Sequence, residues 1–132
     1  MELSKWKRRT LIPLWGDHDQ EDEPCAIIFQ PPSVGLMASW REITLMAPTV
    51  DEETFKDEDH RAKVAKWTQR VHDFRDTMIR DQVLAVDNLT KDGRQIDLDE
   101  AIAFILENEG LREEVFFGIL GEGSVGRAQG KG

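Results

Sequence analysis

The chain has 132 residues, 26 acidic and 17 basic side chains, a net charge of −9 and one cysteine. This length suffices for one domain with its own hydrophobic core. The acidic excess disfavours direct nucleic-acid binding, which needs Lys and Arg facing phosphates, and a single cysteine excludes an internal disulfide. No apolar run reaches the roughly 18 residues of a transmembrane helix, so we expect no membrane contact.

The N-terminal part is predicted to contain a basic arm followed by a β-hairpin. Residues 1–9 are rich in Lys and Arg around Trp6. An exposed Trp beside arginines is typical of a protein–protein hot spot, although a disordered N-terminus explains the same composition. Residues 10–15 and 25–30 are apolar runs of strand length that we expect to pair. Pro13 has no N–H to donate, so the first run is expected to be an edge strand or a strand start.

Two helices are predicted in the middle of the chain. The first spans about 34–46, after Ser33 as a candidate N-cap, although 43–46 can also be read as a strand. The second spans 61–80 and repeats apolar residues at steps of three and four, which predicts one buried face. That face consists of Val64, Trp67, Val71, Phe74 and Met78. The acidic stretch 51–60 is either a loop or the frayed start of the second helix.

A turn at Asp92-Gly93 organises the C-terminal part. Asp-Gly between apolar residues is a strong hairpin signal, because Gly accepts the positive φ of a tight turn. The apolar residues are Val83, Val86 and Leu89 before the turn and Ile96 and Leu98 after it.

Two helices are predicted after this turn. Asp97 is positioned to cap a helix over 98–108 in a capping-box-like arrangement with Glu100. Gly110 is expected to stop that helix in the left-handed conformation. A second helix over 111–120 places Leu111, Val115 and Ile119 on one face.

These elements predict an α+β fold, a helix-rich single domain with a small N-terminal β-hairpin and a C-terminal helix pair. We expect a basic N-terminal arm at residues 1–9, a single globular domain at 10–120 and a flexible Gly-rich tail at 121–132. Five of the twelve tail residues are glycine, which favours disorder of the tail in isolation.

No residue pattern indicates catalysis, so we predict that the chain is not an enzyme and uses no cofactor or metal. Gly121 begins a G-x-G-x-x-G match, but a dinucleotide loop needs a strand before it and a helix after it. His60 and His72 are twelve residues apart on one predicted helix, too far to share a metal, and His18 has no partner at a diagnostic spacing. Cys25 opens an apolar strand, where a buried structural thiol is expected.

The layout resembles the small tail assembly chaperones of long-tailed bacteriophages over roughly residues 8–120. The resemblance is carried by the hairpin-like segment, the Gln30-Pro-Pro-Ser33 link into a helix, the long amphipathic helix at 61–80, the segments at 86–102 and 108–115, and the polar tail. Proteins of that kind are small, acidic and non-enzymatic and act in the host bacterial cytoplasm. The resemblance implies binding to the tape measure protein and tail tube subunits, and a tail that tolerates extension by a programmed frameshift.

We therefore predict a non-enzymatic phage protein-interaction factor, most simply a tail assembly chaperone. The candidate partner-binding residues are Trp6, Arg8, Arg9, Phe116, Phe117 and Arg127, together with the tail. An alternative is a structural virion component, a connector or tail-completion subunit, whose terminal arms order on neighbouring subunits. An acidic inhibitor or nucleic-acid mimic is a further alternative, which predicts carboxylates arrayed on one face. A homo-oligomer is compatible with these hypotheses.

Overall fold

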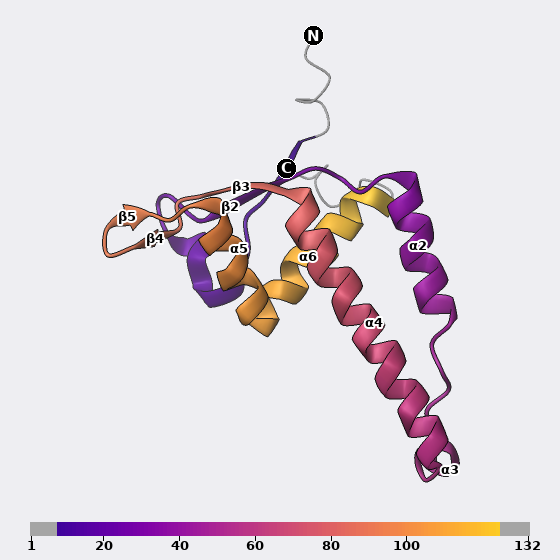
Figure 1. Ribbon diagram of the computed structural model, residues 1–132. Coiled ribbons are helices and arrows are strands. Elements are labelled where there is room, and N and C mark those ends of the chain that lie inside the picture. Colours follow the sequence, from indigo (N-terminus) through magenta and orange to yellow (C-terminus); the bar gives the residue numbers. More distant parts are fainter. Residues whose placement is uncertain (1–7, 125–132) are drawn as a thin grey trace.

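The computed structural model describes residues 8–124, apart from the side chains of residues 18, 19 and 122–124. The elements in chain order are β1 (Arg9–Leu11), the 3-10 helix η1 (Trp15–Gln20), β2 (Ala26–Phe29), α2 (Val34–Leu45), α3 (Glu52–Phe55), α4 (Glu58–Gln82), β3 (Val83–Asp87), β4 (Thr90–Lys91), β5 (Arg94–Gln95), α5 (Leu98–Glu107) and α6 (Glu109–Ser124). Figure 1 shows a body of strands, α5 and α6, from which α2 and α4 project to α3. The predicted helix-rich α+β fold is confirmed.

The sheet has three strands rather than the predicted two. β2 lies in the centre and pairs antiparallel with β1 and with β3. The predicted hairpin of β1 and β2 is confirmed, but β1 ends at Leu11 and the expected strand over 10–15 is wrong beyond it. The reason is local, because Pro13 cannot donate to a ladder and the Glu114 carboxylate accepts the N–H groups of Leu14 and Trp15 instead.

The Asp92-Gly93 turn joins β4 and β5 as the sequence predicts. Asp92 has a φ of 53° and Gly93 a φ of 80°, so both central residues adopt the positive φ of a type I′ turn. Gln95 then turns back to the sheet, since its side-chain amide donates to the Val86 carbonyl at 3.0 Å. This hydrogen bond links the small β4–β5 hairpin to β3.

Replacing Gly93 with alanine is expected to lower the free energy of unfolding by about 1–2 kcal/mol, because an L residue strains at this φ. A Cβ there would meet no atom within 4 Å, so backbone strain is the whole cause. Gly35→Ala is the matched control, because its Cβ would meet only Ser33 Oγ at 3.8 Å. Alanine favours a helix over glycine, so the free energy of unfolding of this variant should rise by about 0.5 kcal/mol. Urea denaturation measures both variants, and changes of the same sign would contradict this account.

The break between α5 and α6 differs from the prediction. Asn108, not Gly110, ends α5, and its side-chain amide donates to the Phe104 carbonyl at 2.7 Å. The Asn108 carbonyl then accepts the Arg112 N–H at 2.8 Å, which begins α6. The expected left-handed stop at Gly110 is therefore wrong. Glycine leaves room there for the Trp15 ring, since a Cβ would lie 3.2 Å from Trp15 Cδ1. The Asp97 cap is present, with the Glu100 N–H donating to its carboxylate at 2.8 Å.

Residues 34–82 form a helical hairpin in which α2 and α4 are joined by the short α3 (Figure 1). Ser33 caps α2 as predicted, and α2 stays helical to Leu45, so the strand alternative for 43–46 is wrong. The acidic stretch 51–60 is largely helical rather than a loop. Asp51 and Thr54 form a reciprocal capping box at the start of α3, and Asp57 caps α4, which begins at Glu58 rather than at residue 61.

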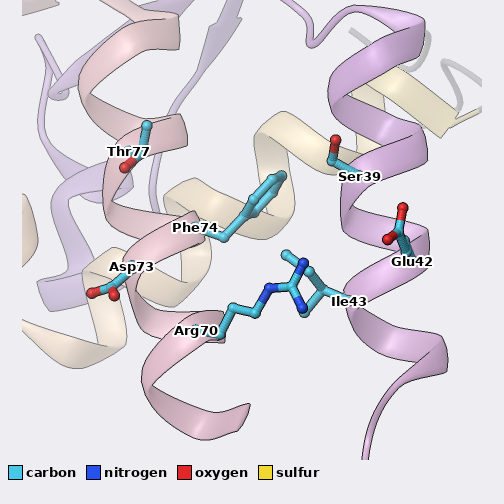
Figure 2. Close-up of a pocket in the computed structure, with 7 residues that line it drawn as sticks. All are labelled: Ser39, Glu42, Ile43, Arg70, Asp73, Phe74 and Thr77. Carbon is cyan, nitrogen blue, oxygen red and sulfur yellow. The ribbon is translucent and has the colours of Figure 1, made fainter. Parts of the chain in front are cut away.

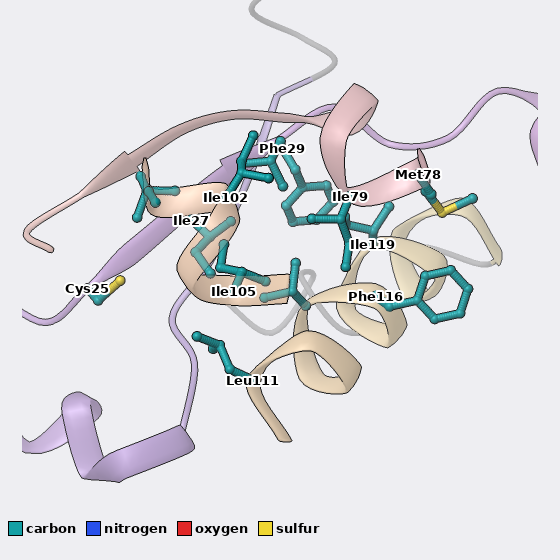
Figure 3. Packing of buried hydrophobic residues seen from close by; sticks show 14 of the residues in the cluster. Cys25, Ile27, Phe29, Met78, Ile79, Ile102, Ile105, Leu111, Phe116 and Ile119 are labelled. Carbon is teal, nitrogen blue, oxygen red and sulfur yellow. The ribbon is translucent and has the colours of Figure 1, made fainter. Parts of the chain in front are cut away.

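The hydrophobic core lies between the sheet, α5, α6 and the C-terminal end of α4 (Figure 3). The side chains with less than 2% exposure include Phe29, Ile79, Ile105, Phe116 and Ile119. Of the face predicted for the long helix, only Met78 is fully buried, while Val64, Trp67, Val71 and Phe74 are half-buried. These four residues pack mainly against α2, because the body of the protein contacts only the last turns of α4.

Candidate protein-interaction site

The free end of the helical hairpin carries a concentration of exposed apolar side chains. Leu45, Met46, Val50 and Phe55 are 81%, 56%, 59% and 61% exposed. They are four of the ten exposed large hydrophobic residues in the described part of the chain, yet they fall within eleven consecutive positions. We call residues 45–59 the tip. A cluster of this kind marks a protein-interaction surface more often than scattered single residues do.

The tip is exposed because α4 is longer than the body that supports it. Its 25 residues span about 37 Å. The buried residues of α4, Arg75, Met78 and Ile79, all lie in its last third, where it packs on α5 and α6. The first half of α4 contacts α2 and α3 instead, and Trp67 Nε1 donates to the Ile43 carbonyl at 2.8 Å to join the two long helices.

A groove of about 380 Å³ runs between α2 and α4 above the tip (Figure 2). Ile43 and Phe74 project into it from the two helices and give it an apolar floor. Glu42, Arg70 and Asp73 supply charges of both signs around this floor. A second open hollow, of about 550 Å³, lies at the tip and is lined by Val50, Phe55 and charged neighbours. Apolar floors with charged rims suit an amphipathic helix as the bound group.

The charges on the helical hairpin are separated along its length. Residues 51–59 of the tip contain six acidic side chains and one lysine. Residues 61–70 of α4, which we call the shaft, contain four basic and no acidic side chains. Hydrogen bonds from Thr54 hold the pKa of the Asp51 carboxyl below its ordinary value.

Another apolar hollow lies between the β4–β5 hairpin, α5 and η1. It has a volume of about 610 Å³ and is lined by Trp15, Leu89, Ile96 and Phe104 among others. The Trp15 and Phe104 rings meet edge to face at 5.7 Å. At its rim, Lys91 Nζ lies 3.9 Å from Glu100 Oε2. No cluster of three potential metal ligands occurs among the residues whose side chains are described.

The structure places the predicted contact residues in three different situations. Arg8 is exposed just before the edge strand β1, Arg9 is half-buried as its first residue, and Phe117 is 54% exposed on α6. Phe116 is 0% exposed, and its prediction as a contact residue is therefore corrected, because it is a core side chain under Trp40. Trp6, Arg127 and the tail beyond residue 124 lie outside the described residues.

Sequence reasoning missed the tip. Its apolar residues do not share a helical period with a buried face, and Val50 and Phe55 stand beside or among acidic residues that favour a solvated loop. The sequence does contain a signal for the tip. Val50 and Phe55 are large apolar residues beside or within a stretch that is otherwise rich in carboxylates. An apolar residue without a periodic partner is a candidate for intermolecular contact.

Cys25 lies in the core, with 7% exposure, as the sequence predicts. Burial raises the pKa of its thiol, and the negative charges of Glu21 and Asp87 raise it further. A raised pKa means less thiolate at neutral pH, so a disulfide reagent should modify Cys25 at least about tenfold more slowly than glutathione. The reaction should reach the free-thiol rate in denaturant. A fast reaction in the folded protein would contradict this placement.

Comparison of the chain with protein-family models, curated proteins and solved structures gives no match. None of the helices in the described part of the chain is both long and apolar enough to cross a membrane.

Proposed function

We propose that this protein is a non-enzymatic interaction factor of phage assembly, a tail assembly chaperone that binds the tape measure protein and tail tube subunits. The observation that carries the proposal is the helical hairpin, which projects apolar side chains away from the body that would otherwise bury them. The resemblance of the chain layout to such chaperones supplies the identity of the clients. Its place of action would be the host bacterial cytoplasm.

The mechanism is shielding of an apolar stripe on a long helical client. The client helix would lie along the groove between α2 and α4, with apolar residues against Ile43 and Phe74 and its end against Val50 and Phe55. The net charge of −9 would keep the complex dispersed while the stripe is covered. No chemical step is needed, because binding alone prevents association between clients.

The test is co-expression with the product of the longest neighbouring open reading frame, followed by size-exclusion chromatography with light scattering. The expected result is a complex that keeps the long helical client soluble when the client alone precipitates. An unrelated acidic protein of similar size, expressed in its place, controls for nonspecific solubilisation. A client that precipitates equally with and without this protein would refute the proposal. A closed ring of fixed size formed without any client would instead support a virion component.

A further inference from the structure

We infer that the helical hairpins of two copies pair antiparallel, with the acidic tip of each copy against the basic shaft of the other. The occupant of this surface is a second copy of the same chain, related by a two-fold axis. This inference goes beyond the proposed function and does not depend on it, because it concerns the protein without any client. The second copy would cover part of the surface that we propose for the client, so the client would displace it.

The first support is the sequence of charges along the helical hairpin. The tip carries six acids and one lysine, and the shaft carries Arg61, Lys63, Lys66 and Arg70 without an acid. The helix dipole accounts for the acids, which stand in the first turns of α3 and α4. It does not account for the bases, because a dipole favours cations in the last turn, and Lys63 and Lys66 precede the end of α4 at Gln82 by more than fifteen residues. The four bases therefore form an exposed basic stretch that the helix dipole does not explain.

The second support is that tip and shaft are not joined by ion pairs within the chain. Ion pairs among the described residues include Arg75–Glu113, Lys91–Glu100, Arg112–Asp76 and Arg112–Glu109. These four pairs lie in the body or where α4 meets α6, and none of the four involves residues 45–70. The opposite charges of the tip and the shaft thus remain available to another molecule.

The third support is that the basic side chains border exposed apolar ones. Lys63, Lys66 and Arg70 follow each other at steps of three and four, so they share one side of α4. Arg70 Nη1 lies 3.6 Å from Met46 Sδ, and Arg61 Nη1 donates to the Phe55 carbonyl at 2.9 Å. An interface centred here would bury apolar surface and pair charges at the same time, which gives both affinity and a fixed orientation.

The charge pattern selects the antiparallel arrangement and the second copy. A parallel pair would place acid on acid and base on base, whereas a two-fold antiparallel pair makes two identical tip-to-shaft contacts. The separation suits this, because Glu58 and Lys66 are about 12 Å apart along α4, well within the reach of two crossed helical hairpins. A uniformly basic helix would match the tip but would be repelled by the shaft. A copy of this chain matches both.

The experiment uses two charge-reversed variants of the full chain. The shaft variant carries Lys63→Glu, Lys66→Glu and Arg70→Glu, and the tip variant carries Glu52→Lys, Glu53→Lys, Glu58→Lys and Asp59→Lys. Asp51, Asp57 and Thr54 are kept because they cap α3 and α4. Asp81→Lys with Glu107→Lys is the control, since both residues are exposed and lie outside the tip and shaft. Circular dichroism verifies that each variant keeps its helices.

Light scattering over a concentration series at low ionic strength gives the readout. The wild-type protein and the control should approach twice the chain mass of 15.1 kDa. Each reversed variant should remain a monomer, at the chain mass itself. An equimolar mixture of the two reversed variants should again approach twice the mass, because each tip then meets a shaft of opposite charge. Association of the wild type should weaken at about 0.5 M salt, where exposed charges are screened. A wild type that stays monomeric, reversed variants that still self-associate, or a mixture that does not associate would each overturn the inference.

Discussion

Replacing Phe116 with alanine is expected to lower the free energy of unfolding by about 3–5 kcal/mol. Phe116 is 0% exposed and lies where α6 meets both long helices of the helical hairpin. Its ring meets Trp40 of α2 edge to face at 5.0 Å, and the Arg75 guanidinium of α4 lies 5.9 Å from its centre. Removal of the ring leaves a cavity, and the Arg75 guanidinium, which is itself 93% buried, loses its aromatic partner. The midpoint of urea denaturation should therefore fall to a lower urea concentration.

The neighbouring residue provides a matched control for this substitution. Phe117 is next in sequence and chemically identical, but it is 54% exposed on the outer side of α6. Phe117→Ala should therefore cost less, about 1 kcal/mol, because it loses mainly an edge-to-face contact with Phe116 at 5.2 Å. Equal losses in the two variants would show that Phe116 does not join α2, α4 and α6 as described.

Replacing Val50 and Phe55 together with aspartate is expected to weaken client binding by about 30-fold, since truncated hot-spot residues cost about 2 kcal/mol or more. Both side chains are exposed, so the melting temperature should change little. Val34→Asp is the control, because Val34 is 88% exposed but begins α2 at the end far from the tip. Isothermal titration with the client measures all three proteins. Unchanged affinity of the double variant would remove the tip from the binding site.

The features that the sequence predicts correctly are those determined by neighbouring residues. Ser33 and Asp97 cap helices because each carboxyl or hydroxyl reaches an N–H three residues on, and Asp92-Gly93 turns because glycine permits its φ. The pairing of β2 with β3 is different, since Ile27 and Val86 are partners across almost sixty residues. No pattern in the neighbouring residues distinguishes β3 from a strand of the β4–β5 hairpin that follows it. The pairing of β3 with β2 also requires α4 to bring β3 back to the sheet.

The candidate site was harder to predict than the fold because exposure depends on where other elements end. The apolar period through Val64, Trp67 and Val71 would be the same if α4 packed on the body of the protein or only on a single neighbouring helix. In the structure, α6 reaches only the upper part of the helical hairpin, so the lower part remains open. The same reasoning failed for Phe116 and Phe117, two adjacent aromatic residues whose exposures differ only because α6 presents them in different directions.

Hydrogen–deuterium exchange with and without the client, at a concentration where the protein alone is monomeric, tests the central claim, that the helical hairpin is the binding surface. The result we expect is slower exchange on client binding in residues 45–70, with little change in the β4–β5 hairpin beside the Trp15 hollow. Slower exchange confined to that hollow or to β1, with residues 45–70 unchanged, would contradict the claim and place the binding site on the body of the protein.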